Sequence, residues 1–198
     1  MNRQLVAATT NPGKLREIRE LLGGSPYDIL SLADIGFSQD IAEDGKTFEE
    51  NAIKKARTIY EYCGKITIAD DSGLMIEHLN GEPGVDSALY MGVDTPYPVR
   101  FTHILERLAG IEGSGRAACF VCVVAIASSK GIETVRGECA GLIAKAPLGA
   151  GFGYDPIFYL PSQKKTFGEM SIQEKNAISH RGIALRLTKE RLYENFGI

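Results

Sequence analysis

Short apolar runs alternate with amphipathic stretches along this chain, and most of them are closed by glycine, proline or small polar residues. Residues 4–8 have the pattern of a short buried strand, and residues 9–13 follow as a turn. Residues 15–22 then carry apolar side chains at helical spacing, and this stretch stops at Gly23-Gly24. The pattern predicts a strand, a loop and a helix at the start of the chain.

A second helix is predicted to begin after Thr47, whose hydroxyl can form a capping box with Glu50, and to end at Gly64. Residues 66–69 follow as a strand, and the carboxyl end of this strand delivers Asp70-Asp71-Ser72-Gly73. Neighbouring residues of a strand face opposite sides, so at most one of the two aspartates points into a given cleft.

The second half of the chain mixes helices with long β-branched runs. The predicted elements are a helix at 99–108, strands at 116–127 and 132–143 joined by a hairpin at 128–131, a short strand at 157–160, a helix capped by Ser171 with Glu174, and a last helix from about residue 180. Strands and helices alternate at first and a hairpin follows, so we expect an α/β fold with a mixed sheet and flanking helices.

Composition places the chain among ordinary globular proteins. It has 198 residues, 44% of them hydrophobic and 24% charged, which favours one domain with a sizeable core. Its net charge of -3 provides no field for a polyanion, so we expect no nucleic-acid partner. The longest apolar stretch, 120–127, is strand-sized, and no signal-peptide pattern follows Met1. We therefore expect a cytoplasmic protein with no membrane partner.

The four cysteines are too few and too scattered for a disulfide framework. Cys119 and Cys122 have C-x-x-C spacing, but they lie inside a buried-strand pattern rather than at a helix start. We interpret them as core thiols, in preference to a metal or redox pair.

The first candidate for chemistry is the loop Thr9-Thr10-Asn11-Pro12-Gly13-Lys14, which joins a strand to the amino end of a helix. Free backbone N–H groups and the helix dipole suit phosphate there, and Lys14 adds a positive charge. The loop matches neither the Walker pattern nor the dinucleotide fingerprint. Taken alone, Asn-Pro-Gly is also typical of an ordinary helix start.

The second candidate is the pair Asp70-Asp71. Carboxylates beyond the ends of strands are where open α/β sheets place ligands, and Glu43-Asp44 can contribute a further carboxylate to an oxygen site for Mg²⁺. Ordinary turn and cap chemistry would also account for these acids. Lys55, one helical turn after Asn51, can reach the same region from beside the sheet.

The third candidate lies where the last two helices meet. Lys175, His180 and Arg181 place basic groups at a helix start that normally favours acids, which invites an anion, although a solvated turn is the alternative. The turn Phe152-Gly153-Tyr154-Asp155 offers aromatic rings and a carboxylate for a flat ring, unless the rings belong to the core. The candidates together indicate one ligand with phosphates, a metal and an aromatic base, which is a nucleoside triphosphate.

Five segments in this order resemble the inosine triphosphate pyrophosphatase family, the dITP/XTP pyrophosphatases, nearly end to end. They are Ala8–Lys14, Thr47–Ala52, Ala69–Leu74, Gly153–Phe158 and Glu174–Gly182. The resemblance implies residues 1–198 as a single bilobed nucleoside triphosphate pyrophosphatase domain, with an elongated mixed sheet, two lobes around a central nucleotide cleft, and a homodimer. It implies hydrolysis of ITP, dITP and XTP to the monophosphate and pyrophosphate, which removes aberrant purines from the nucleotide pool.

The resemblance also implies roles for single residues. Glu43 and Asp71 would hold Mg²⁺; the catalytic group would comprise Asp71, Lys14 and Lys55; and the nucleotide would contact Thr9, Thr10, Asn11, Pro12, Gly13, Lys14, Ser72, Phe152, Gly153, Tyr154, Asp155, Lys175, His180 and Arg181. Thr10 and Leu89 depart from a glycine and an arginine that are common in the family.

The sequence is compatible with two roles for Asp71 and with two alternative functions. Asp71 can act as a base or only as a metal ligand, because a carboxylate bound to Mg²⁺ is a poor proton acceptor. A pyrophosphatase for modified pyrimidine nucleotides and a nucleotide-binding regulator without catalysis are the alternatives. A panel of triphosphates would separate the first, and the presence of both Glu43 and Asp71 beside the lysines argues against the second.

Overall fold

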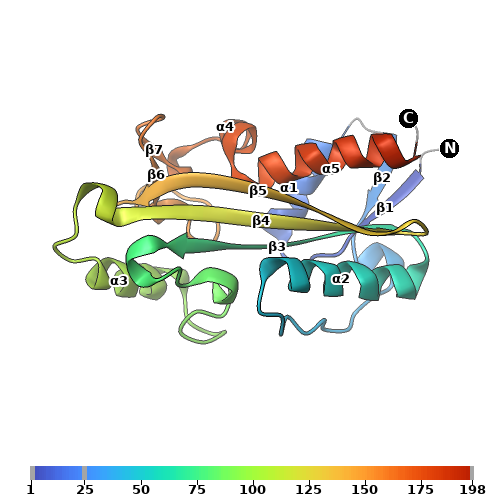
Figure 1. The fold of residues 1–198 in the computed structure, drawn as a ribbon, viewed down its shortest axis with the longest axis horizontal. Coiled ribbons are helices and arrows are strands. Elements are labelled where there is room, and N and C mark those ends of the chain that lie inside the picture. Colours follow the sequence, from blue (N-terminus) through green and yellow to red (C-terminus); the bar gives the residue numbers. More distant parts are fainter. Residues whose placement is uncertain (1–2, 24–25, 197–198) are drawn as a thin grey trace. The chain divides into compact units, whose positions relative to one another are not determined.

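A seven-stranded mixed sheet organises the protein, seen here in a computed structural model that describes residues 3–23 and 26–196 (Figure 1). The elements in chain order are β1 (Arg3–Ala7), α1 (Pro12–Leu22), β2 (Tyr27–Leu30), α2 (Phe48–Cys63), β3 (Ile66–Ile76), α3 (Tyr97–Arg107), β4 (Ala117–Ser128), β5 (Gly131–Ile143), β6 (Phe158–Leu160), β7 (Lys165–Thr166), α4 (Ile172–Ile178) and α5 (His180–Phe196). No helix of the described part reaches the length and apolarity that a membrane span requires.

The order of strands is β2-β1-β3-β4-β5-β6-β7. β1 pairs in parallel with both β2 and β3, whereas β6 pairs antiparallel with β5 and β7. The predicted mixed sheet with flanking helices is therefore confirmed. β2 and β7 have no clear signal in the sequence because they are only 4 and 2 residues long.

The chain divides into two compact units. Unit 1 comprises Met1–Asp71, Cys122–Gly137 and His180–Ile198, and unit 2 comprises Ser72–Val121 and Glu138–Ser179. Within unit 1, α2 lies on one face of the sheet and α1 and α5 lie on the other (Figure 1). The core beneath α1 and α5 combines Ile18 and Leu185 from these helices with Leu5 and Ile68 from the strands.

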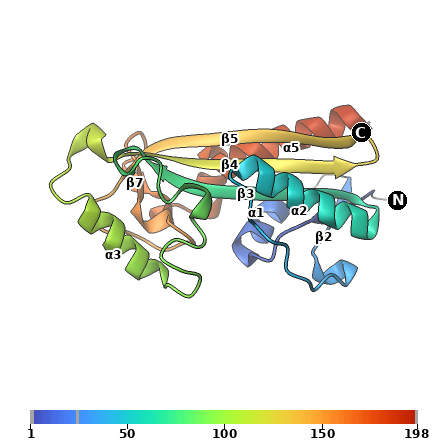
Figure 2. The ribbon, with the colours of Figure 1, turned by 60° about the horizontal axis from the view of Figure 1, so that its bottom comes forward.

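Unit 2 has its own core. Phe101 and Ile104 of α3 (Figure 2) pack with Leu74 and Ile76 of β3 and with Phe158 of β6. All five side chains are at most 6% exposed, so this core accounts for the apolar face predicted for the helix near residues 99–108.

The predicted end of β3 is wrong. The strand does not stop at Ala69 but continues through Asp70, Asp71, Ser72 and Gly73 to Ile76. Four turn-favouring residues in a row suggest a loop from local preference, but Leu74 and Ile76 beyond them are fully buried. Tertiary packing overrides local preference here, and the two aspartates lie in the middle of a strand.

The helix boundaries agree closely with the sequence. α1 ends at Leu22 with Gly23 as its cap, while Gly24, the second glycine of the predicted stop, lies outside the described residues. Thr47 caps α2 by accepting from the Glu50 N–H. The reciprocal half of that capping box is absent, because the Glu50 carboxylate accepts from the Lys46 N–H instead. The box predicted for Ser171 and Glu174 is complete.

Candidate active site

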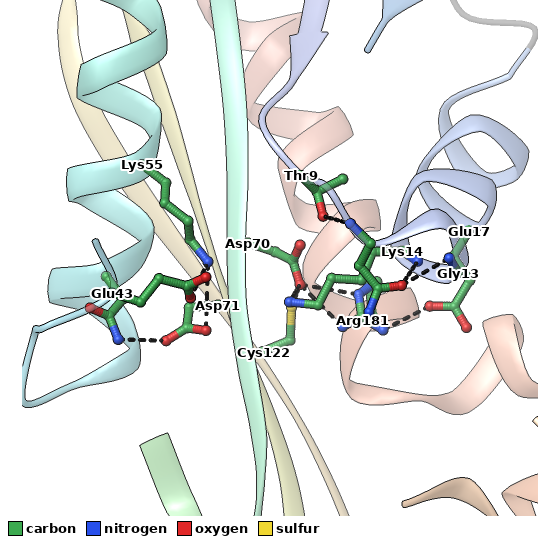
Figure 3. A network of polar contacts seen from close by, with 12 residues as sticks. Thr9, Gly13, Lys14, Glu17, Glu43, Lys55, Asp70, Asp71, Cys122 and Arg181 are labelled. Atoms are coloured by element: carbon green, nitrogen blue, oxygen red, sulfur yellow. Dashed lines mark hydrogen bonds and ion pairs between the residues drawn. The ribbon is translucent and has the colours of Figure 1, made fainter. Parts of the chain in front are cut away.

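Asp70 and Asp71 are neighbours in β3, and their side chains lie on opposite sides of the strand (Figure 3). This confirms the opposite orientation expected from strand geometry, and it divides the charged residues of unit 1 into two groups. Asp70 faces α1 and α5, and Asp71 faces α2 (Figure 3). Both carboxylates are at least nine-tenths buried.

The register of the parallel strands brings the loop after β1 to the Asp70 side. Ala7 pairs with Ile68, so the residues that follow β1 lie beside the centre of β3. Lys14, in the first turn of α1, reaches across and places its Nζ atom 3.0 Å from Asp70 Oδ2. Lys14 was singled out in the sequence for phosphate, and the structure adds a buried acid as its partner.

The backbone of this loop differs from the expectation. Asn11 caps α1, and its Oδ1 accepts from the N–H groups of Gly13 and Lys14 at 2.9 and 3.2 Å. Thr9 Oγ1 in turn accepts from the Asn11 N–H. The amide donors of Asn11, Gly13 and Lys14, expected to be free for phosphate, are therefore bonded within the loop. Thr10, Asn11 and Pro12 are exposed at its surface.

Arg181 lies at the start of α5 and is only 2% exposed. Its Nη1 donates to Glu17 at 2.8 Å, and its Nε and Nη2 donate to Asp70 Oδ2 at 3.2 and 3.1 Å. Burial disfavours the charge of Asp70, but the charges of Lys14 and Arg181 outweigh this effect and hold its pKa below the ordinary value. The sequence analysis did not single out Glu17. It is a charged residue within the amphipathic stretch 15–22, and nothing in that pattern indicates that it is buried.

On the other side of β3, Asp71 lies among three polar side chains from α2 and the preceding loop. Asn51 Nδ2 donates to Asp71 Oδ2 at 3.1 Å, and Asn51 Oδ1 accepts from the Gly45 N–H, so this amide is held at both ends. Lys55 Nζ lies 2.8 Å from Glu43 Oε2 and 3.7 Å from Asp71 Oδ1. Asn51 and Lys55 thus reach the same site, as their helical spacing predicts.

This group fits a divalent cation. Glu43 and Asp71 already share one cation, the Lys55 ammonium, so their oxygens converge on a common position. Burial raises the pKa of Asp71 above its ordinary value, and added positive charge would favour the ionised form. The described residues contain no cluster of three or more His, Cys, Asp or Glu side chains for a metal. Two carboxylates completed by phosphate and water are what Mg²⁺ commonly uses.

The candidate residues of unit 2 form a second polar group. Asp155 Oδ2 accepts from Lys175 Nζ at 2.7 Å and from the Phe152 N–H at 3.2 Å. The Lys175 ammonium lies 4.2 Å from the centroid of the Phe152 ring. Phe152 is partly exposed, and Gly153 beside it has a positive φ of 61°. The predicted aromatic turn with its lysine therefore forms one contact group.

Tyr154 belongs to the core instead of to an open ring-binding face. It is 3% exposed, and its ring packs edge-on against Tyr97 at 5.3 Å. Its hydroxyl donates to the Ser87 carbonyl at 2.9 Å. Of the two roles considered for the aromatic residues of this turn, Tyr154 has the core role, because neighbouring rings and the Ser87 carbonyl surround it. Ser72 is half-buried in β3, and His180 is buried at the start of α5.

The interpretation of Cys119 and Cys122 as core thiols is confirmed for Cys122, which is buried, whereas Cys119 is only partly buried. All four are free, and Cys122 and Cys139 are buried. Burial raises the pKa of the Cys122 thiol to about 12 and that of Cys139 to about 11, so both are protonated and unreactive at neutral pH.

The fold and this site define an α/β protein with a cluster of acidic and basic side chains on each side of one strand, in which Asp70, Asp71 and Arg181 are buried and Glu43 is exposed. Their chemistry is suited to a phosphorylated ligand and a divalent cation. The profile of the Ham1 family matches residues 5–191. A dITP/XTP pyrophosphatase of Bacillus subtilis (strain 168) is 46% identical over 186 residues, which are 93% of this chain and 94% of that protein. A dITP/XTP pyrophosphatase of Geobacter sulfurreducens is 44% identical and covers 96% of each chain.

Solved structures give the same relationship. A HAM1 protein from Coxiella burnetii superimposes with a TM-score of 0.87 at 42% identity, over 97% of this chain and 99% of that one. The Ham1 protein of Staphylococcus aureus gives the same TM-score at 36% identity, with 97% and 99% of the chains covered. The chain belongs to the Ham1 family. The family resemblance identified in the sequence is confirmed.

Proposed function

We propose that the protein hydrolyses deaminated purine nucleoside triphosphates, ITP, dITP and XTP, to the monophosphate and pyrophosphate. The observation that carries this proposal is the group of Asp71, Glu43 and Lys55, in which two carboxylates converge on one cation. The names of the curated relatives support two of these substrates, dITP and XTP. The activity removes aberrant purines before they are used as precursors.

In this proposal each charged group has a separate task. Lys14 and Lys55 contact phosphate oxygens, and Asp71 and Glu43 hold Mg²⁺. When bound, Mg²⁺ would neutralise phosphate charge and act as a Lewis acid during attack of water on the α-phosphorus. Asn51 orients Asp71, because its own amide is fixed by the Gly45 N–H. Asp71 serves as a metal ligand, since a carboxylate engaged by Mg²⁺ is a poor proton acceptor.

In this proposal, the second polar group, that of Phe152, Asp155 and Lys175, contacts the purine base. Phe152 is partly exposed and can offer its ring for stacking, and Lys175 and Asp155 fix the turn that carries it. Ser72, His180 and Arg181 are the further nucleotide contacts that the family resemblance implies. Hypoxanthine and xanthine present an oxygen at position 6, whereas adenine presents an amino group, so a donor facing that position disfavours ATP. Base reading by Arg181 stays a prediction.

The finer features of the enzyme belong to the same proposal. Dependence on Mg²⁺, a homodimer, a cytoplasmic location and the absence of nucleic-acid or membrane partners are expectations from the sequence. A single bilobed domain over residues 1–198 with a nucleotide cleft is also an expectation from the sequence.

The test is a panel of triphosphates followed by phosphorus NMR with and without Mg²⁺. We expect pyrophosphate as the first phosphorus product from ITP, dITP and XTP, much slower turnover of ATP and GTP, and loss of activity after chelation with recovery on adding Mg²⁺. Stepwise release of orthophosphate would contradict the proposal. Faster turnover of a modified pyrimidine triphosphate would favour the alternative substrate class.

A further inference from the structure

One buried oxygen, Asp70 Oδ2, is shared by two basic side chains from different elements (Figure 3). Lys14 of α1 places Nζ 3.0 Å from this atom, and Arg181 of α5 donates to it through Nε and Nη2 at 3.2 and 3.1 Å. The Cys122 thiol approaches the same oxygen at 3.9 Å. The other oxygen, Oδ1, is buried and has no hydrogen-bond partner among the described residues.

The two basic side chains are not held equally. Arg181 also donates to Glu17, so its guanidinium bridges two acids. For Lys14, Asp70 is the acidic partner that the described residues provide. The side chains of Asp70, Glu17 and Arg181 are 1–2% exposed, whereas that of Lys14 is 15% exposed. Lys14 is therefore the member of this cluster that can turn toward a ligand.

The sharing of one oxygen creates competition. A carboxylate oxygen has a limited number of lone-pair positions, so each charge-assisted donor weakens the hydrogen bonds that the other donors make to the same oxygen. Arg181, with two N–H groups on Oδ2, thereby loosens the hold of Asp70 on Lys14. Removing the Arg181 donors would leave Asp70 free to bind Lys14 more tightly, while removing the Asp70 charge would release Lys14.

We propose that Asp70 is a positioning residue. Its carboxylate holds the Lys14 ammonium away from phosphate, and Arg181 determines how strong this hold is. The inference rests on the phosphate role given to Lys14 above. It explains why a buried acid of this site faces away from Asp71 and yet contacts a residue of the phosphate loop. It also couples the start of α5 to phosphate binding.

The first test is the affinity for inorganic pyrophosphate with Mg²⁺, measured by titration calorimetry. Pyrophosphate has no base, and the proposed reaction leaves it intact. We expect Asp70→Asn to tighten binding roughly three- to tenfold, because a released lysine gains the hydrogen bond that it gave to Asp70. A purely structural role predicts unchanged or weaker binding. Glu112→Gln, which removes an exposed acid from a lysine pair in unit 2, is the matched control and should change nothing.

A second pair of variants separates positioning from a general change of charge. The gain from Asp70→Asn should disappear when Lys14→Met is present in both proteins that are compared. If the gain persists without the lysine, the effect is only the lost negative charge, and the inference is wrong.

Arg181→Lys provides a test that keeps Asp70 in place. We expect it to weaken pyrophosphate binding severalfold in the natural chain and to have no effect in the Asp70→Asn background. If Arg181→Lys changes the pyrophosphate affinity equally in the natural chain and in the Asp70→Asn background, the coupling is wrong. If Asp70→Asn does not fold, an unchanged pyrophosphate affinity of Arg181→Lys in the natural chain overturns the coupling instead. If Lys14→Met leaves pyrophosphate binding intact, the phosphate role of Lys14 in the proposed function falls as well. If it abolishes binding while Asp70→Asn tightens nothing, only the inference falls.

Discussion

Asp71 is held by Asn51 and lies near Lys55, and it faces away from the Asp70 cluster. Asp71→Asn keeps the size of the side chain but removes a charge that the proposed cation needs. We expect kcat for ITP to fall by about 10²- to 10³-fold, with a smaller change in nucleotide affinity, because the charge acts mainly in the transition state. Steady-state kinetics with calorimetric binding would measure both quantities.

Asp44→Asn is the control for this prediction. Asp44 is an exposed acid next to Glu43, and it pairs with Lys54 at 2.6 Å. The variant should retain nearly all of kcat. An Asp71→Asn protein with normal kcat would remove Asp71 from the proposed machinery, and equal losses in both variants would point to a general effect of charge.

Arg181 has a large structural role besides any contact with the base. Arg181→Ala would remove a buried cation that Glu17 and Asp70 share, and Asp70 would keep only Lys14 from the pair of cations that now contact it. Breaking such a group from one side commonly costs about 3–5 kcal/mol, so we expect the free energy of unfolding to fall by about this amount. Urea denaturation would measure it. Arg191→Ala, which removes an arginine paired with Glu194 at the surface, should have a much smaller effect.

This result decides how activity data on Arg181 are interpreted. A loss of ITP turnover in Arg181→Ala reports on base selection only if the protein is folded under the assay conditions. A stability equal to that of the natural chain would mean that the buried bonds of Arg181 contribute little to folding.

At the scale of elements, the start of α5 sits against β5 with no room for a side chain between them. A Cβ atom added at Gly137 would lie 2.2 Å from the His180 carbonyl oxygen and 2.6 Å from the Ala184 nitrogen. Both contacts are backbone atoms, so Gly137→Ala must displace α5 or bend β5. We expect a loss of about 1–3 kcal/mol in stability together with weaker nucleotide binding, since His180 and Arg181 would move with the helix.

Gly115→Ala is a matched control. A Cβ at Gly115 would meet only one side-chain atom, the Cγ2 methyl of Ile111, at 2.8 Å, and no backbone atom, so a small shift of one side chain relieves the contact. Denaturant unfolding and ITP affinity should therefore change little. If Gly137→Ala behaves like this control, the close approach of α5 to β5 does not position the site.

At the scale of the whole molecule, three strands carry residues of both units. Asp71 and Ser72 are consecutive in β3, and β4 and β5 also contain residues of each unit. Disrupting either core would break strands that both units use, so we expect one cooperative unfolding transition. Calorimetry should give equal calorimetric and van't Hoff enthalpies. Two separate transitions would contradict the single domain predicted for residues 1–198.

Matched core variants sharpen this prediction. Leu5 in unit 1 and Leu74 in unit 2 are both fully buried. Leu5→Ala and Leu74→Ala should each lower the single transition of the whole protein, by about 2–5 kcal/mol in stability. A variant that shifts only part of the transition would show that its unit unfolds independently.

The sequence by itself determined the α/β class, most helix boundaries and the family. These follow from local signals: Asn11 and Thr47 are side chains that cap helices, Gly64 allows the left-handed turn that ends α2, and the hairpin turn lies between two long apolar runs. Strand periodicity also determined that Asp70 and Asp71 face opposite sides. Such features depend on neighbours within a few residues, which the sequence contains directly.

The tertiary structure alone decided which partners these residues meet. Local preference indicates a turn after Ala69, but the buried Leu74 and Ile76 extend β3 through both aspartates. Arg181 lies 164 positions from Glu17 and 111 from Asp70, and their buried bonds follow from the parallel register of β1 with β3 and from the packing of α5. Burial converts these charges into a paired network, because an ion removed from water requires a partner, and the choice of that partner depends on contacts between distant parts of the chain.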